Sequence, residues 1–159
     1  MEQNPAEIAP LNPEGNNLFA ALLGGSVAAA VGAVLWAVIA VMTGMMIGWV
    51  AVGIGFMVGY TVRIFGKGSE PMFQILGAVL SLLGCLAGNL LMVCAFVSRQ
   101  QQIPLLTLLT HLNPAVIVSL MVDTFSAMDL LFYGIAIYEG FRFSRAPMAV
   151  PARTHGLSA

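Results

Sequence analysis

The chain has 159 residues, of which 59% are hydrophobic and 8% are charged. Soluble proteins carry roughly 25% charged residues, and a soluble domain this small has too little interior to hide so much apolar surface. The composition therefore predicts one domain surrounded by lipid. The net charge of −1 gives no indication of nucleic-acid binding, which needs a clustered basic surface.

The first segment, residues 1–17, is polar and acidic, with Glu2, Glu7 and Glu14 and neither Lys nor Arg. It lacks the basic start and the short apolar core of a secretory signal. Because it is also rich in Pro and Asn, we expect a disordered acidic tail.

Residues 18–62 contain no charged side chain. This stretch is about twice the roughly 20 residues that cross a bilayer as a helix, so it must fold back on itself. The turn is expected around Thr43 and Gly44. It separates a first span at about 18–42 from a second span at about 45–65.

A third span is expected at about 72–97, after the sequence "RIFGKGSEP". The "GKGS" within it is not a phosphate-binding loop, which requires Gly, four residues and then Gly-Lys-Ser/Thr. Thr61 stands where the first Gly should be, and Gly68 follows the Lys. We therefore expect this segment to form a turn between two spans.

A fourth span is expected at about 127–143. The preceding "SAMD" resembles a capping box at Ser126, although Asp129 replaces the usual Glu or Gln. At the other end of the domain, Asn16 or Asn17 can cap the first span. The segment 146–159 is expected to be a disordered C-terminal tail.

Residues 104–122 form the connector between the third and fourth spans. The leucines of "PLLTLLTHL" recur with helical spacing, but a helix this short cannot cross a bilayer. We expect it to lie along the membrane surface with its apolar face down. Asn113 and Pro114 start a second helical piece, which either re-enters the membrane or leads into the last span.

Positive charges predict the orientation. Four spans place one group of cations on one side of the membrane, namely Arg63, Lys67, Arg142, Arg145 and Arg153, and leave only Arg99 on the other. Positive residues favour the cytoplasm, so both termini are expected there.

Small residues recur in every span at the spacing of four that favours close helix packing in lipid. The glycines expected at helix contacts are Gly24, Gly32, Gly55, Gly59, Gly77, Gly84, Gly88 and Gly140. Such rows favour a compact bundle within one chain, with an added contact between chains left open.

Two polar residues lie at depth. Asn89 is expected to make a hydrogen bond between helices. Glu139 lies roughly 15 Å from Asp129 along the last span, near its inner boundary. We expect Glu139 to face protein and to pair with Arg142 or Arg63, since a buried charge is costly in lipid. Alternatively, an ion path would use Asn89, Asp123, Asp129, Tyr133 and Glu139.

No catalytic, cofactor-binding or metal-ligating cluster can be assembled from the sequence. Cys85 and Cys94 are nine residues apart on one helix, about 13 Å along its axis, which is too far for a disulfide. With only His111 and His155 besides, no metal site is expected. We therefore expect no cofactor and no enzymatic activity.

Three segments, "GWVAVGIGFMVGYTVRIFGKG", "ILGAVLSLLGCLAGNLL" and "MDLLFYGIAIYEGFRFS", resemble those of small bacterial membrane proteins with four predicted spans. The resemblance covers roughly residues 18–145. It implies a location in the bacterial inner membrane and agrees with the number of spans. No activity is established for that family, so the resemblance assigns no functional residue.

Together these observations predict an all-α fold: a four-helix transmembrane bundle with a short amphipathic surface helix between spans 3 and 4. The expected function is a non-enzymatic structural or interaction subunit that contacts the lipid bilayer and packs against itself or another membrane protein. The alternative is a small channel or transporter that uses Asn89, Asp129 and Glu139.

Overall fold

The computed structural model of the protein describes residues 17–45, 48–110, 113–124 and 126–145. Across these ranges the regular secondary structure is entirely helical, so the predicted all-α class is confirmed. The helices are α1 (Leu18–Thr43), α2 (Trp49–Gly66), α3 (Pro71–Gln101), α4 (Leu105–Thr110), α5 (Pro114–Thr124) and α6 (Ala127–Phe143). The tails predicted before residue 17 and after residue 145, together with His111 and His155, lie outside the described residues.

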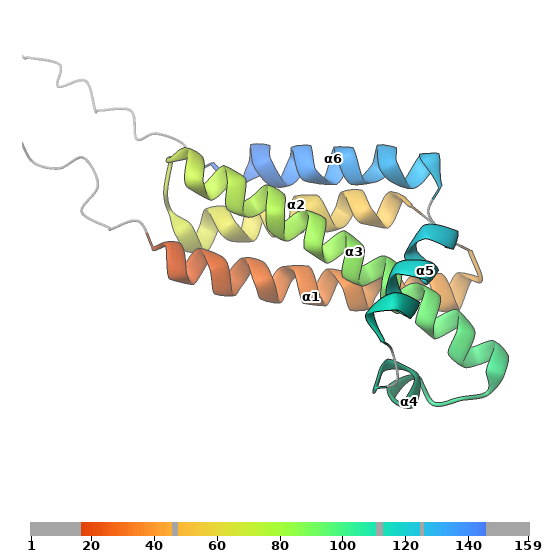
Figure 1. Cartoon of the computed structure of the whole chain (residues 1–159). Coiled ribbons are helices and arrows are strands. Elements are labelled where there is room, and N and C mark those ends of the chain that lie inside the picture. The colour runs from red at the N-terminus through yellow and green to blue at the C-terminus, as the bar shows by residue number, and fades with distance from the viewer. Residues whose placement is uncertain (1–16, 46–47, 111–112, 125, 146–159) are drawn as a thin grey trace, which may run out of the picture.

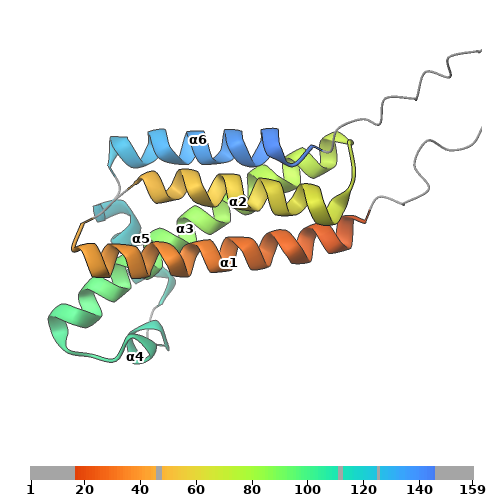
Figure 2. The same ribbon diagram turned by 180° about the vertical axis from the view of Figure 1, so that it is seen from behind.

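The four longer helices α1, α2, α3 and α6 lie side by side, and the short helices α4 and α5 gather at one end of them (Figures 1 and 2). The start of α1, the α2–α3 connection and the end of α6 lie together at the opposite end (Figure 1). One hydrogen bond fixes part of this end, since Asn17 N donates to Gly66 O at 3.2 Å. These are the segments that the count of positive charges assigns to one side of the membrane.

Three helices, α1, α2 and α3, are long and apolar enough to cross a membrane, judged on the described residues. Helix α6 has 17 residues, which corresponds to about 25 Å of rise, against a hydrocarbon core of roughly 30 Å. The structure thus supports a membrane protein with three candidate spans. A fourth crossing does not follow from length and composition alone.

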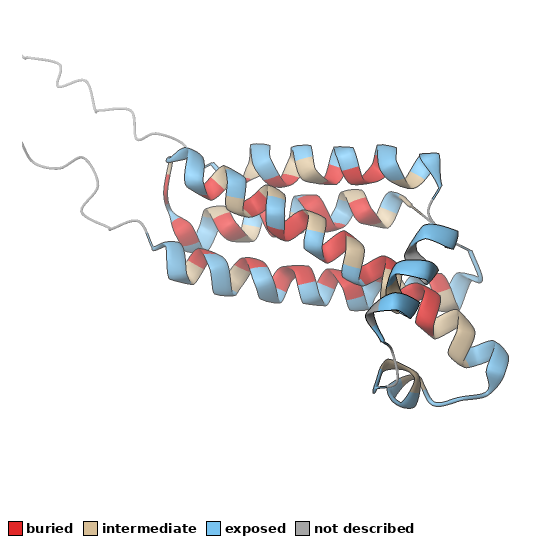
Figure 3. Ribbon diagram, viewed as in Figure 1, coloured by how far each residue is buried: buried red, intermediate tan, exposed pale blue. Residues whose placement is uncertain are grey.

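Each of the four longer helices has buried residues along one side and exposed residues along the other (Figure 3), and on α1 the buried side consists mainly of small residues. In α1 the buried residues are Ala21, Gly25, Ala28, Ala29, Gly32, Ala33, Trp36 and Ala40. Large side chains of the same helix are turned outward, among them Phe19 at 70% exposure and Val27 at 63%. A water-soluble helix has the reverse pattern, so this one indicates lipid as the solvent.

All eight glycines expected at helix contacts lie against another helix or its side chains. A Cβ on Gly88 would come within 2.8 Å of Trp36 Cε3, and one on Gly84 within 2.9 Å of Ile54 Cγ2. Contacts to backbone are tighter still, because a Cβ on Gly55 would meet the backbone of Ala136 in α6. Glycine at these positions is what allows the helix axes to approach.

The helix ends follow the predicted capping residues. Asn17 Oδ1 accepts from Ala20 N at 2.9 Å, and Ser126 forms a complete capping box with Asp129. Gly44 ends α1 in the left-handed conformation, with φ at +67°, which a residue without a Cβ adopts without strain. Both predicted caps and the predicted turn are thus confirmed.

Two helix boundaries differ from the predicted spans. Helix α2 begins at Trp49 rather than near residue 45, because Gly44 has just ended α1 and the chain must reverse before helix resumes. Helix α3 continues past residue 97 to Gln101. Its last residues are polar but remain good helix formers, so the helix outlasts the apolar stretch that the sequence marks.

The connector forms two separate helices, α4 and α5, both of which contact α3. Asn113 Oδ1 accepts from Ala115 N at 2.7 Å and from Val116 N at 3.1 Å, which starts α5 as predicted. Because α5 ends at Thr124 and α6 begins at Ala127, α5 is not a continuation of the last predicted span.

The backbone contact at Gly55 yields a test. Gly55→Ala places a methyl group about 2.7 Å from Ala136 Cα, so α6 must shift away from α2. We expect the free energy of unfolding to fall by about 1–3 kcal/mol, as for an overpacked core. Thermal unfolding in detergent, followed by far-UV circular dichroism, measures the change. Gly53→Ala is the matched control, since a Cβ there has nothing within 4 Å; equal unfolding temperatures for the two variants would contradict this packing.

Candidate functional site

A buried polar cluster joins α2, α3 and α6, and we define it as Cys85, Asn89 and Tyr133. Cys85 and Asn89 lie four residues apart on α3 and so share one face of that helix. Tyr133 comes from the second turn of α6. All three are buried, with exposed fractions of 0%, 2% and 4%.

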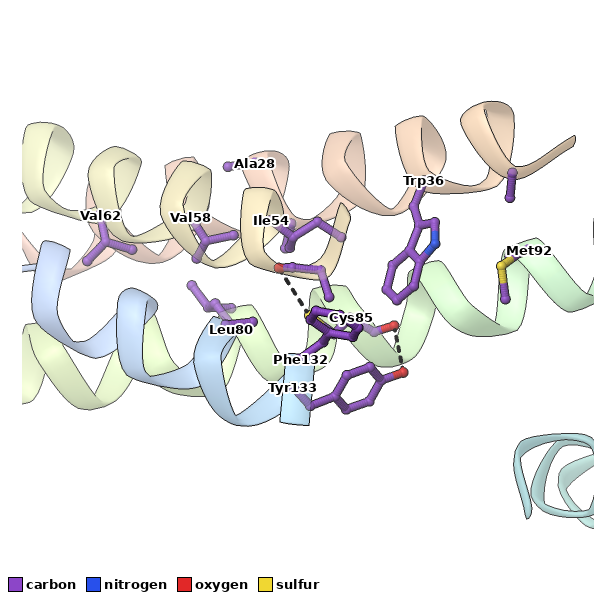
Figure 4. Packing of buried hydrophobic residues seen from close by; sticks show 14 of the residues in the cluster. Ala28, Trp36, Ile54, Val58, Val62, Leu80, Cys85, Met92, Phe132 and Tyr133 are labelled. Atoms are coloured by element: carbon purple, nitrogen blue, oxygen red, sulfur yellow. Dashed lines mark hydrogen bonds between the residues drawn. The ribbon is translucent and has the colours of Figure 1, made fainter. Parts of the chain in front are cut away.

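Hydrogen bonds connect the cluster across the three helices. Asn89 Nδ2 donates to Tyr133 Oη at 3.1 Å, and Tyr133 Oη donates to the Cys85 carbonyl at 3.3 Å. Cys85 Sγ donates to the carbonyl of Ala51 in α2 at 3.7 Å. Figure 4 shows the bonds from Tyr133 and Cys85 as dashed lines within the surrounding apolar side chains. The expected interhelical hydrogen bond of Asn89 is therefore present.

Trp36 of α1 lies at about the same level along the bundle as this cluster, because it packs on Gly88, the residue before Asn89. Its indole Nε1 is buried and has no hydrogen-bond partner among the described residues. Every one of the four longer helices thus contributes at least one polar group at or next to this level. The arrangement is neutral, since it contains no acid and no base.

The Cys85 thiol makes the contacts of a packing residue. A cysteine nucleophile needs a nearby base, whereas the Cys85 thiol is bonded to a backbone carbonyl. Within the described residues there is also no group of three His, Cys, Asp or Glu side chains that could hold a metal ion. Satisfied amide and hydroxyl groups fix the relative positions of α2, α3 and α6.

A second polar position lies on α6 at Glu139. Its carboxylate oxygen Oε2 is buried and has no hydrogen-bond partner in the described part of the chain. Arg142 Nη1 donates instead to Tyr138 Oη at 2.8 Å, and its guanidinium carbon lies 5.9 Å from the centre of that ring. The predicted pair between Glu139 and Arg142 is therefore not formed through Oε2, because the arginine turns back along its own helix to the Tyr138 hydroxyl.

The predicted pair between Glu139 and Arg63 is likewise not made through Oε2. Arg63 lies in the last turn of α2, where a cation is favoured by the helix dipole. Its backbone carbonyl accepts from Lys67 N at 3.1 Å, which closes that turn. Arg63 thus contributes to the C-terminal end of α2 through its charge and its backbone carbonyl.

The carboxylates of Asp123 and Asp129 each accept a hydrogen bond from a residue close in sequence. Asp129 Oδ2 accepts from Ser126 N at 2.9 Å in the capping box. Asp123 Oδ2 accepts from Ser119 Oγ at 3.3 Å along α5. The predicted polar residues therefore occupy separate places: Asp123 and Asp129 near the start of α6, Asn89 with Tyr133 in the interior, and Glu139 closer to the far end.

Two members of this interior were missed by sequence reasoning. Cys85 reads as a small hydrophobic residue, although its spacing of four from Asn89 places both on one face. The sequence around Trp36 is apolar and does not indicate that its indole would lie at the level of buried polar groups. No protein family, curated protein or solved structure matches this chain.

The cluster predicts the effect of removing one hydroxyl. Tyr133→Phe leaves Asn89 Nδ2 without the acceptor that it has in the structure, and we expect a loss of about 0.6–2 kcal/mol in unfolding free energy. Denaturant titration in mixed micelles measures the loss. Tyr138→Phe is the control, because that hydroxyl meets Arg142 on the exposed surface; a control that loses as much stability would contradict a special role for the interior bond.

Proposed function

We propose that the chain is a multi-pass protein of the bacterial inner membrane that crosses the bilayer four times, with both termini in the cytoplasm. It acts as a non-enzymatic interaction subunit that assembles with a second copy of itself. The observation that carries the assembly is an apolar groove on the outside of α1 and α2, with Gly24 and Ala28 among its lining residues.

The fourth crossing is supported by the surroundings of α6. This helix packs along two candidate spans, α2 and α3. Its outer face presents large side chains, including Met128 at 61% exposure and Leu131 at 56%. Its small residues point inward, since Ala136 is fully buried and a Cβ on Gly140 would meet Ser81 and the carbonyl of Gly77 in α3. A short span is accommodated in lipid by local thinning of the bilayer.

The groove between α1 and α2 has a volume of about 430 Å3. Its floor contains Gly24 and Ala28, and its walls include Val31, Met57 and Phe65. Thr61 is the one hydroxyl among its lining residues, and that hydroxyl already donates to Met57 O at 2.7 Å. The groove therefore presents apolar shape and little else to its surroundings.

A second copy suits this groove because the α1 wall of the groove is itself an exposed ridge. Leu23, Val27 and Val31 follow one another along α1 at intervals of four, and all three are exposed. In a two-fold arrangement the ridge of each copy enters the groove of the other, as two copies of one surface patch require. Small residues in the floor allow the close backbone approach that drives helix association in lipid.

The geometry favours this function over transport. Tyr133 and Glu139 are six residues apart on α6, so their side chains leave the helix about 120° apart. Asp129 and Asn89 already bond to neighbouring protein groups. The residues that a transport path would use are thus divided between different faces and local contacts, and they do not form one line through the molecule.

Crosslinking in native membranes tests the assembly. Val27→Cys places a thiol on the ridge, where the wild-type side chain is 63% exposed, and we expect mild oxidation to give a disulfide-linked dimer. Leu130→Cys is the control, because that position is 65% exposed but lies on α6, away from the groove. Cys85 and Cys94 are fully buried and contribute little background. Equal dimer yields at both positions, or a Val27→Cys adduct with a different protein only, would contradict self-assembly.

A further inference from the structure

A second groove lies between α1, α3 and α4, and we call it the Arg99 groove. Its volume is about 330 Å3. Val34, Val38 and Met42 line it from α1, Leu91 and Ala95 from α3, and Leu105 from α4. Every lining residue is apolar. The groove is therefore a place where hydrocarbon can lie against the protein.

Arg99 is fixed at one end of this groove. It lies in the last turn of α3, and its Nη1 donates at 3.0 Å to the carbonyl of Val41, which is itself a lining residue. The guanidinium is exposed and carries five N–H donors, so one bond to Val41 leaves donors for a ligand. A cation therefore stands where the apolar groove ends.

The dimensions of the groove select its occupant. The lining residues of α1 run from Val34 to Met42, about 12 Å along the helix axis. A transmembrane helix needs roughly 30 Å of contact to span the hydrocarbon core, whereas part of an acyl chain needs far less. Leu105 of α4 lines the groove as well, and α4 lies beside the end of α3 (Figure 1).

The position of Arg99 agrees with the depth of a lipid headgroup. Helix α1 has 26 residues, about 39 Å, so its last turn extends beyond a hydrocarbon core of roughly 30 Å. Val41 lies in that last turn, so a core centred on α1 would end close to Val41 and would leave the guanidinium bonded to it at the interface that lipid headgroups occupy. Arginine binds phosphate through paired N–H donors, which gives the groove a charge preference as well as a shape.

We propose that the Arg99 groove binds one anionic phospholipid, with an acyl chain along α1 and α3 and the phosphate on Arg99. This site is independent of the proposed dimer, because the dimer groove lies between α1 and α2. The lipid fills the angle between α1 and α3 and connects α4 to the rest of the molecule. An anionic lipid is bound more strongly than a zwitterionic lipid with identical acyl chains.

Native mass spectrometry of the full-length protein in detergent tests this binding. The protein is titrated with phosphatidylglycerol or with phosphatidylcholine of the same chain composition, and the fraction in each lipid-bound state is counted. We expect phosphatidylglycerol to be preferred. Arg99→Gln should reduce its affinity by about fivefold while the affinity for phosphatidylcholine changes little, and Arg99→Lys should keep the preference.

Matched variants distinguish binding at this site from nonspecific electrostatic or apolar binding of lipid elsewhere on the protein. Arg142→Gln removes an exposed arginine that is bonded to Tyr138 at the opposite end of the molecule, and it should leave the preference intact. Ala95→Phe fills the groove and should weaken both lipids, whereas Ala87→Phe, on an exposed part of α3 outside the groove, should weaken neither. An equal loss in Arg142→Gln, no loss in Arg99→Gln, or unchanged binding in Ala95→Phe would overturn the proposal.

Discussion

Close approach of helix backbones through small residues is the constraint on which the rest of this structure depends. In lipid, a leucine gains little by moving from the outside of a helix to the inside, because acyl chains are as apolar as the protein interior. Association must come from many short contacts, and these need a small residue on one helix wherever the neighbouring helix comes closest. The helices approach most closely where Gly55 packs against the backbone of Ala136 and where Gly77 packs against Gly140. Large residues are then left to face the bilayer, where they cost nothing.

Small-residue packing alone leaves the helices free to slide, and the interior polar cluster supplies the missing register. Asn89 and Tyr133 can form their bond only when α3 and α6 are aligned within a fraction of a turn. The Cys85 thiol adds a contact to α2. Since unpaired polar groups are expensive in hydrocarbon, a shifted arrangement would lose these bonds without water to replace them.

Local features of the fold were predictable because they depend on neighbours in sequence. Asn17, Gly44 and Ser126 define helix ends through bonds or dihedral angles that span only a few residues. The bond that Arg142 makes was not predictable, because both Tyr138 and Glu139 lie within three or four residues of it on one helix, and its guanidinium donates to Tyr138. Neither groove was predicted from the sequence, since both arise from the angles at which α1 packs against α2 and α3. Hydrophobic periodicity predicts which face of a helix is apolar, but it does not predict the angle at which two helices cross.

Labelling of single cysteines tests most directly whether hydrocarbon surrounds these helices on four crossings. Cysteines are placed at Lys67, Leu106 and Arg145, all of which are exposed, and intact cells are treated with a membrane-impermeant maleimide. Lys67 and Arg145 should be protected until the cells are opened, while Leu106 should react from outside. If Arg145 instead reacts together with Leu106, α6 does not cross the membrane and the account fails.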